Sequence, residues 1–516
     1  MTRPTGKISI IQSASSLLFN RSGPAAKFRK LFFENLEVEE ITNLSALRFK
    51  VFKRKTHATK TSVAPSCIVT FKPNAPHPDH RMSYVSPKQL DQLVDEFHII
   101  VEPRDRKWVY VSEAAEDPAV WPALMWGGAR DKVFLQHLKS RLTLANAEQR
   151  NIVSKRKGII FGDRKKPQPK IRGRRILDGK DFPAGSLLYL NADDLPKNKE
   201  LQTDSRASTD FSAFACPQLI VKQGWKKSLS RFQARITKSS RSEGALCTQS
   251  YLTVHAREGQ QNPLEAACLA LNSIFATYFL LLTSSRFASY RPEPLVEELL
   301  NVPIPKPRPR MLQGIKTWED IDARMFEEFA FKESERVLVE DLFRFTLADF
   351  RGDENSFGRQ RTVRLHERSS EPQLTGYCEH VIRVLKAGFG RDKSISATIF
   401  QEETDPLPYR LIAFELGGAS GKGISTKSLR TSELLTEFER LNRIWSEHDQ
   451  SRGSSVYHRR IARIYDGQGN TPAIFIIKPD LNQYWTRSAG LSDGDEIALD
   501  FFRWRGNAET SAAIAE

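Results

Sequence analysis

The order of apolar and polar residues near the start of the chain predicts strands separated by a helix. Residues 7–11 and 64–71 are short apolar runs typical of buried strands, and residues 38–44 have the same character. After the first run, apolar residues recur at helical spacing over 28–36. Apolar strands joined through helices are typical of parallel sheets covered by helices. We therefore expect a mostly parallel sheet in which residues 7–11 form a central strand, next to strands that this chain does not supply.

Further along, a long apolar run is framed by basic and aromatic segments. Residues 266–282 predict one buried helix, shorter than the roughly twenty residues that span a bilayer. A basic, aromatic segment at 217–236 and a strand-like run at 245–256 precede it. An Arg/aromatic turn with a Pro-rich exit follows at 283–307. The pattern predicts a sheet that presents cations and flat rings, closed by a helix whose end returns the chain to one place.

Composition changes again after this exit. Residues 314–350 are acidic and helix-periodic, a polar linker follows, and the last 145 residues alternate helices and strands as a small α/β unit does. The stretch 417–426 imitates a phosphate-binding loop but lacks its first glycine and its Ser/Thr, so a glycine-rich hairpin is favoured. Residues 457–460 (YHRR) fit partner contact or a strand surface. We divide the chain into residues 1–75, 76–150, 151–312, 313–370 and 371–516.

The charge balance favours a polyanionic partner. The chain has 78 Lys and Arg against 62 Asp and Glu, a net charge of +16, although a merely soluble basic protein would also fit. Its five cysteines are widely spaced and mostly lie in apolar runs, which indicates core thiols in a reducing cytosol. No secretion signal is recognisable at the N-terminus, so we expect a cytoplasmic protein.

Two segments concentrate the cations. Residues 151–175 contain one acid and residues 222–242 contain none, and Trp225 and Phe232 interleave with the lysines of the second. A solvated loop is the alternative for the first segment, but uncompensated cations favour phosphate contact there. The second segment fits both backbone positioning and base contact. Our candidate DNA-binding residues are Lys165, Lys166, Lys222, Gln223, Trp225, Lys226, Lys227, Arg231, Arg286 and Arg291.

Four acids lie between the two basic segments. Paired acids can be metal ligands or nuclease carboxylates, but the run lacks the (D/E)-x-K element of a nuclease. Neighbouring Pro, Asn, Thr and Ser residues favour a solvated loop with caps, and we predict no metal site. The acids are Asp193, Asp194, Asp204 and Asp210.

The order of segments in 217–305 resembles the target-recognition domains of restriction-modification DNA methyltransferases, both fused and as separate specificity subunits. Those families repeat a P-x-I-I-x-(K/R) strand, an aromatic and basic turn, an LxxxLNS helix and a terminal xxPIPxP. The resemblance implies recognition of double-stranded DNA. The matching residues are Pro217, Leu219, Ile220, Lys222, Leu269, Leu271, Asn272, Ser273, Val302, Pro303, Ile304 and Pro305.

Residues 7–72 resemble the distal half of the catalytic domain of adenine-specific (N-6) DNA methyltransferases. The family's S-adenosylmethionine loop and its (N/D)PP(Y/F/W) loop for the extruded adenine do not occur in this sequence. The nearest imitation, Asn262-Pro263-Leu264, lacks the second proline and the aromatic ring. The resemblance therefore implies a fold and no catalytic residue. Its matching residues are Ser15, Ser16, Leu17, Leu18, Phe19, Asn20, Phe28, Arg29, Val38, Ile41, Asn43, Leu44, Ser45, Ala64, Pro65, Ile68, Val69 and Phe71.

Together these features predict an α/β protein with three parts: the distal part of a methyltransferase-like sheet, an α+β target-recognition domain and a small C-terminal α/β domain. The resemblance implies adenine methylation in a restriction-modification or phage-defence system, with S-adenosylmethionine as cofactor of the complete enzyme and none bound by this chain alone. An upstream catalytic half or subunit would supply the missing loops. Whether this chain belongs to an active enzyme stays open, since a non-catalytic specificity subunit or a truncated gene product fits the same residues.

Overall fold

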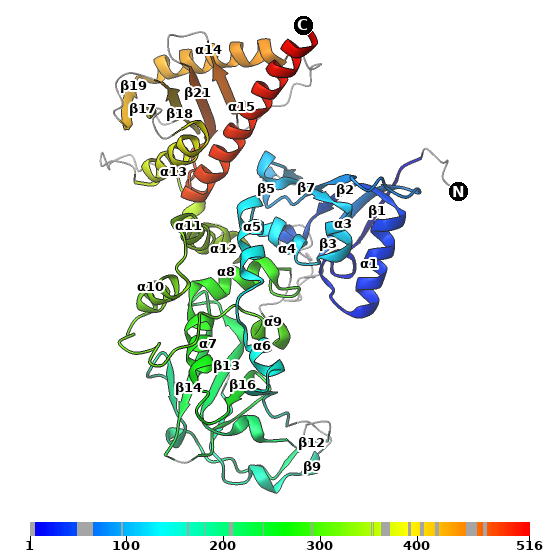
Figure 1. The fold of residues 1–516 in the computed structure, drawn as a ribbon, viewed down its shortest axis with the longest axis vertical. Coiled ribbons are helices and arrows are strands. Elements are labelled where there is room, and N and C mark those ends of the chain that lie inside the picture. Colours follow the sequence, from blue (N-terminus) through cyan, green and yellow to red (C-terminus); the bar gives the residue numbers. More distant parts are fainter. Residues whose placement is uncertain are drawn as a thin grey trace. The chain divides into compact units, whose positions relative to one another are not determined.

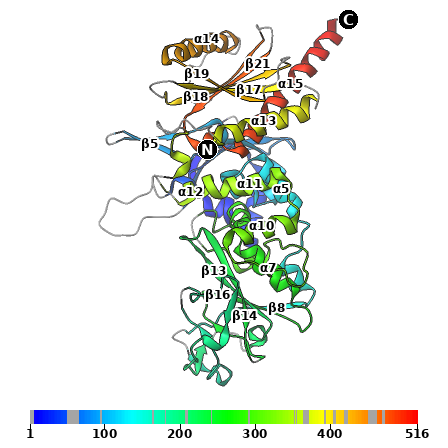
Figure 2. The ribbon, with the colours of Figure 1, turned by 90° about the vertical axis from the view of Figure 1, so that its left-hand side faces the viewer.

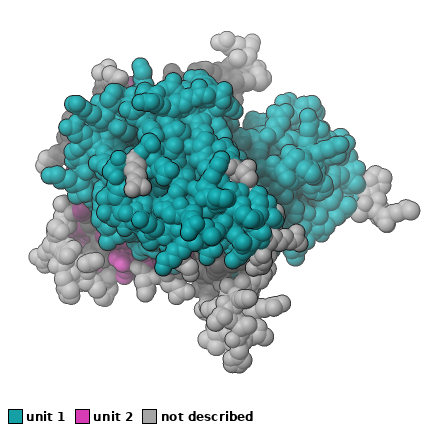
Figure 3. Space-filling view, turned by 90° about the horizontal axis from the view of Figure 1, so that it is seen from below, with its two compact units in different colours: residues 1–99, 105–339 teal, residues 100–104, 340–516 magenta. Residues whose placement is uncertain are grey.

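The chain forms two compact units, residues 1–99 with 105–339 and residues 100–104 with 340–516, coloured separately in Figure 3. The division falls inside the acidic helical segment 314–350. Both units mix helices and strands. The computed structural model describes residues 6–48, 65–93, 96–161, 165–179, 181–205, 210–240, 242–289, 293–351, 353, 356–362, 372–390, 394–402, 407–417, 423–449, 462–467 and 472–515.

The first sheet, here the N-terminal sheet, has the strand order β1-β3-β2-β4-β7 (Figure 1). The pairs β1–β3, β3–β2 and β4–β7 are antiparallel, and β2–β4 is parallel. The expected mostly parallel sheet is therefore wrong. Strand β1 lies at an edge of the described sheet, and its expected central place, which required strands from outside this chain, stays a prediction. Local composition identifies a strand, whereas the direction of its neighbour depends on long-range connections. The strands are β1 (Ile8–Ser13), β2 (Glu37–Asn43), β3 (Ser66–Lys72), β4 (Arg81–Val85) and β7 (Arg106–Tyr110).

Aromatic packing joins helix α1 to this sheet and to the helices that follow it. Phe33 stacks on Trp121 with ring centroids 5.7 Å apart, and Tyr84 lies 5.4 Å from the same indole. Phe28 and Leu31 are 47% and 53% exposed, so the buried face of α1 is narrower than its apolar spacing suggests. The helices here are α1 (Gly23–Asn35), α3 (Val111–Glu116), α4 (Val120–Trp126) and α5 (Ala129–Leu138).

The central module, residues 143–304, is built on a sheet of order β11-β14-β13-β16-β8. Its pairs are antiparallel except β11–β14. One face packs on α7 and α8, and an irregular layer that includes Ile171, Phe182 and Phe214 covers part of the other. The strands are β8 (Val153–Lys157), β11 (Tyr189–Asn191), β13 (Gln218–Lys226), β14 (Arg231–Lys238) and β16 (Tyr251–Ala256).

The long apolar run forms two helices, α7 (Asn262–Asn272) and α8 (Ile274–Thr283), bent by 78°. The prediction of one helix was wrong because tertiary contacts stabilise the break. The Asn272 amide donates to the Ala234 carbonyl at 2.8 Å and accepts from its N–H at 3.2 Å. Asp322 accepts the Ile274 N–H at 2.9 Å and so caps α8. In the described part of the chain no single helix suffices to cross a membrane, although this bent, buried pair has the length and composition.

The two ends of the central module lie side by side. The Ile304 N–H donates to the Leu142 carbonyl at 2.8 Å, and Thr143 forms a β-bridge with Pro303. The chain thus enters the module just before α6 and leaves it just after α9. Helices α10 and α11 follow, and α10 packs on α7 and α8. The bounds are α6 (Leu144–Gln149), α9 (Val296–Leu300), α10 (Trp318–Phe329) and α11 (Glu333–Asp341).

The second unit contains a sheet of order β19-β17-β18-β21-β20, in which only the described pair β17–β19 is parallel. Helices α13 and α15 cover one face and α14 the other (Figure 2). Residues 418–422 of the rejected phosphate loop and residues 457–460 lie outside the described residues. The elements are α13 (Pro372–Phe389), β17 (Ile395–Glu402), β18 (Tyr409–Leu416), β19 (Ile424–Leu429), α14 (Thr431–Asp449), β20 (Ala462–Asp466), β21 (Ala473–Pro479) and α15 (Arg487–Ala515).

Candidate nucleic-acid interface

The end of β13 meets the Arg/aromatic turn that follows α8. The Gln223 side chain donates to the Pro294 carbonyl at 3.0 Å. The Phe287 ring lies 5.5 Å from Trp225 and 5.2 Å from Phe232, centroid to centroid. These contacts confirm the prediction that the end of the long apolar run returns the chain to one place, which is here the end of β13. We call this region the β13 rim; it comprises Lys222, Gln223, Lys226 and residues 284–289.

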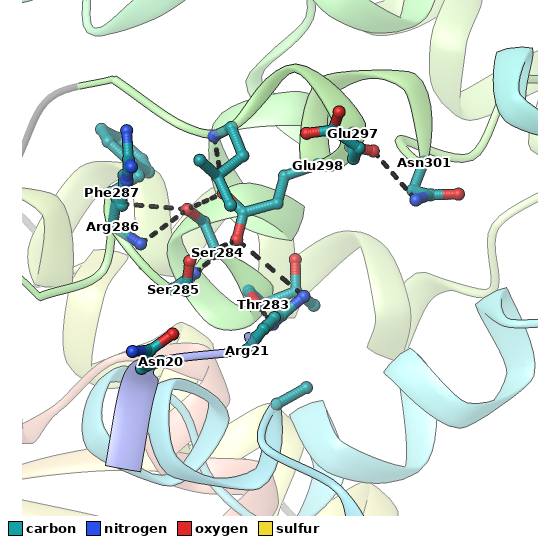
Figure 4. Close-up of polar contacts among 12 residues, drawn as sticks. Asn20, Arg21, Thr283, Ser284, Ser285, Arg286, Phe287, Glu297, Glu298 and Asn301 are labelled. Carbon is teal, nitrogen blue, oxygen red and sulfur yellow. Dashed lines mark hydrogen bonds and ion pairs between the residues drawn. The ribbon is translucent and has the colours of Figure 1, made fainter. Parts of the chain in front are cut away.

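A buried carboxylate fixes the turn at this rim. Glu298 is 7% exposed and accepts hydrogen bonds from the Ser284 hydroxyl at 2.7 Å, the Ser285 N–H at 2.7 Å and the Leu295 N–H at 2.8 Å (Figure 4). Arg21 donates to the Thr283 carbonyl and lies 3.9 Å from Glu298. Arg286 is half-buried within this ordered turn, so its backbone position is set by its neighbours.

Two of the predicted lysines share one acid. Lys226 Nζ lies 2.6 Å from Asp181 Oδ2, and Lys222 Nζ contacts Oδ1 of the same carboxylate. Hydrogen bonds from Lys222 and then Lys226 hold the pKa of Asp181 below its ordinary value. Lys227, the next residue, is exposed in the hairpin turn. The basic segment therefore presents two lysines, Lys222 and Lys226, whose charges Asp181 partly neutralises. Beside them lies the exposed cation of Lys227.

Two other candidates are buried. Arg231 is 7% exposed and forms a two-pronged pair with Asp322, at 2.7 and 2.5 Å, while its guanidinium lies over the Trp318 ring. Trp225 is 8% exposed and packs on Phe287. We assign both to holding the hairpin against the helices, and leave them out of the candidate DNA surface.

The remaining candidates lie elsewhere. Lys165 and Lys166 belong to β9 (Lys165–Pro167), which pairs with β12 (Gln202–Asp204), and Lys166 donates to the Ser205 carbonyl at 3.0 Å. In Figure 1 this ribbon lies at the end of the central module opposite α8. The structure therefore does not bring these two lysines to the β13 rim. Arg291 lies outside the described residues.

Three of the four acids of the intervening segment bind backbone groups or lie within the fold, and Asp194 is exposed. Asp193 accepts the Ser240 N–H at 2.9 Å, and Asp210 accepts the Ser212 N–H at 2.9 Å. Asp204 is buried in β12, not in a loop as expected. Within the described ranges no group of three or more His, Cys, Asp or Glu is arranged to hold a metal ion.

Sequence reasoning missed an open cleft of about 810 Å³ at the opposite end of β13 and β14. Its lining combines Arg174, Lys238 and His255 with the acids Glu243 and Glu258. Arg174 donates to the Phe214 and Gly244 carbonyls at 2.7 and 3.0 Å, so its charge already serves the fold. The lining comes from several separate segments, which explains why no single motif revealed it. Its mixed charge favours no particular ligand.

Some of the residues on which the predicted methyltransferase resemblance rests hold the N-terminal sheet together. Arg29 is buried and donates to the carbonyls of Leu17, at 2.9 Å, and Asn20. Asn43 donates to the Tyr84 hydroxyl at 2.7 Å and accepts the Ser45 N–H at 3.0 Å. These contacts link separate parts of the motif, and they make these residues structural.

Among known proteins, no family model matches the chain, and a search of curated proteins finds no significant match. The assignment of function consequently rests on the residues and the geometry described above.

Proposed function

We propose that this chain is the DNA target-recognition component of an adenine-specific DNA methyltransferase that uses S-adenosylmethionine when complete. The observation that carries the proposal is the convergence of the basic end of β13 with the Arg286 turn, which Glu298 holds in place. The net charge of +16 supports a polyanionic partner. The chain resembles target-recognition domains along the same elements.

Within this proposal the two groups of cations have different tasks. Lys165 and Lys166 contact phosphates, which positions the duplex without reading its sequence. Gln223 and Arg286 meet base edges, because Gln pairs with adenine and Arg with guanine in the major groove. A restriction-modification or phage-defence system is the setting in which such recognition directs methylation to one sequence.

The open edge of β1 is the place we propose for the catalytic half. Among the described strands β1 pairs with β3 alone, and Ile11 is 76% exposed beside Ile10 at 36%. Soluble proteins usually protect such an edge with charges, yet β1 reads ISIIQS. The opposite edge strand, β7, carries Arg106 and Lys107. A strand of the catalytic half added at β1 would make this strand central in the assembled sheet.

A binding experiment with random duplex DNA tests the first part. The purified chain should bind DNA, and the affinity should fall by orders of magnitude over a few-fold rise in salt, since about five or more phosphate contacts release counterions. The chain alone should transfer no labelled methyl group. Salt-insensitive binding, or none, contradicts the recognition role, and methylation by the isolated chain contradicts the need for a catalytic half.

Co-expression with a subunit that carries the S-adenosylmethionine and adenine loops, which we expect an upstream gene to encode, tests the second part. The two should form a complex that methylates adenine, and Ile11→Lys should abolish the complex because a charged edge opposes strand addition. The matched control is Trp108→Lys on β7, which is 59% exposed and should leave assembly intact. A chain that binds DNA but never assembles would favour the alternative, a non-catalytic specificity subunit.

A further inference from the structure

Asp181 occupies an unusual position beside the β13 rim. Its carboxylate receives the ammonium groups of Lys222 and Lys226, which stand four residues apart on β13. The side chains of Lys222 and Lys226 are 13% and 31% exposed, and that of Asp181 is 47% exposed. The acid is thus the most exposed of the three side chains, so a polyanion that reaches the two ammonium groups from solvent meets its carboxylate as well.

The segment around Asp181 is anchored on both sides. The Tyr251 hydroxyl donates to the Gly179 carbonyl at 3.0 Å, and Arg235 donates to the Pro183 carbonyl at 2.8 Å. The centroid of the Phe182 ring lies 5.3 Å from that of Tyr251, and the Arg235 guanidinium lies over the Phe182 ring, 4.7 Å from its centroid. Because its neighbours are packed against the sheet, the carboxylate is presented to the lysines by the fold.

We propose that Asp181 occupies in the free protein the place of a DNA phosphate, and that it competes with DNA for Lys222 and Lys226. The proposal rests on the DNA-recognition role proposed above and deepens it. Two ammonium groups that converge on one carboxylate are equally suited to phosphate oxygens. Lysine side chains are flexible enough to turn from one anion to the other. Lys222 in particular reaches a phosphate only when Asp181 releases it.

The competition lowers the affinity for DNA of every sequence. A protein that searches a genome meets a large excess of non-target sites, so weak general binding shortens the time spent on them. Contacts at the rest of the β13 rim then have to supply the affinity for a target. Asp181 is in this sense a residue that governs specificity without touching a base.

The test compares Asp181→Ala with Asp194→Ala by fluorescence anisotropy on a random-sequence DNA duplex. Asp194 is an exposed acid of the same module, so its removal measures the general gain from losing one negative charge. Two solvent-accessible pairs are together worth about a three- to tenfold change in a binding constant. We expect Asp181→Ala to bind that much more tightly than Asp194→Ala. Its salt dependence should steepen by about one to two units, at roughly 0.9 per added phosphate contact.

Two further variants identify the cause. Asp181→Asn retains the shape of the side chain and should also tighten binding, which separates the effect from any local unfolding. In the Lys222→Ala/Lys226→Ala background, Asp181→Ala should change nothing beyond the Asp194→Ala control. A persistent gain in that background overturns the competition.

The outcomes separate this inference from the proposed function. Wild-type binding with equal affinities for Asp181→Ala and Asp194→Ala overturns the inference alone, as does weaker binding by Asp181→Ala. Absence of DNA binding by the wild type and by every variant removes both.

Discussion

The two basic segments of the central module have a similar density of cations but place many of them in different environments. In residues 151–175 the side chains of Lys165, Lys170 and Arg172 are exposed. In the β13–β14 hairpin, by contrast, Arg231 and Arg235 are each 7% exposed, and Lys222 and Lys226 bind an acid. The density of cations along a sequence therefore does not report how many of them are available to DNA.

The largest effect that tests this contrast is on stability. Arg231→Ala leaves the Asp322 carboxylate, whose side chain is only 15% exposed, without its ion-pair partner, and breaking a largely buried pair in this way typically costs about 3–5 kcal/mol. We expect a loss of that size in the free energy of unfolding, measured by chemical denaturation. Lys227→Ala, at the exposed neighbouring turn, should change it by about 0.5 kcal/mol or less. A stable Arg231→Ala variant that binds DNA poorly would return Arg231 to the DNA surface.

The turn on Glu298 provides the next effect. Glu298→Ala removes the acceptor of several buried hydrogen bonds, and each unsatisfied donor costs about 1–3 kcal/mol. Amide hydrogen exchange at Ser285 and Leu295 should accelerate, and Glu297→Ala, an exposed neighbour, serves as control. Unchanged protection at both amides would show that the turn does not depend on this acid.

The reading residues should show sequence-dependent losses. On a duplex selected by the chain, Gln223→Ala or Arg286→Ala should each cost about 1–3 kcal/mol of binding free energy, with little change on random DNA. Titration of both duplexes by anisotropy measures the difference. Equal losses on the two duplexes would remove the recognition assignment.

The smallest effect belongs to the exposed lysines. Lys165→Ala/Lys166→Ala should weaken binding to all sequences about equally and lower the salt slope by about 1.8, or 0.9 for each phosphate contact. Arg231→Ala cannot change DNA affinity alone in this way, because the substitution also lowers the stability of the fold. Losses confined to the selected duplex would instead make these two lysines part of the reading surface.

Sequence patterns predicted the positions of helices and strands better than they predicted which elements pair or pack with one another. The strands at Ile8–Ser13 and Glu37–Asn43 followed from local composition, but the antiparallel pairing of β1 with β3 did not. The break at Ser273 depends on Asp322 and the backbone of Ala234, both distant in sequence. The burial of Arg231 depends on the same aspartate, 91 residues away. The Arg286 turn was recognisable because its Ser, Arg, aromatic and Pro residues are contiguous.

The meeting of Leu142 with Ile304 makes the central module a cassette. Its two ends are joined by one hydrogen bond of 2.8 Å, at the spacing of adjacent strands, about 5 Å. A foreign module with ends spaced alike could be grafted between these positions without stretching the surrounding scaffold. Such an exchange would have to retain the α8 face that packs on α4, because that contact belongs to the scaffold and the module alike. Recombination between genes could exchange the whole module in the same way, with its two junctions near Leu142 and Ile304.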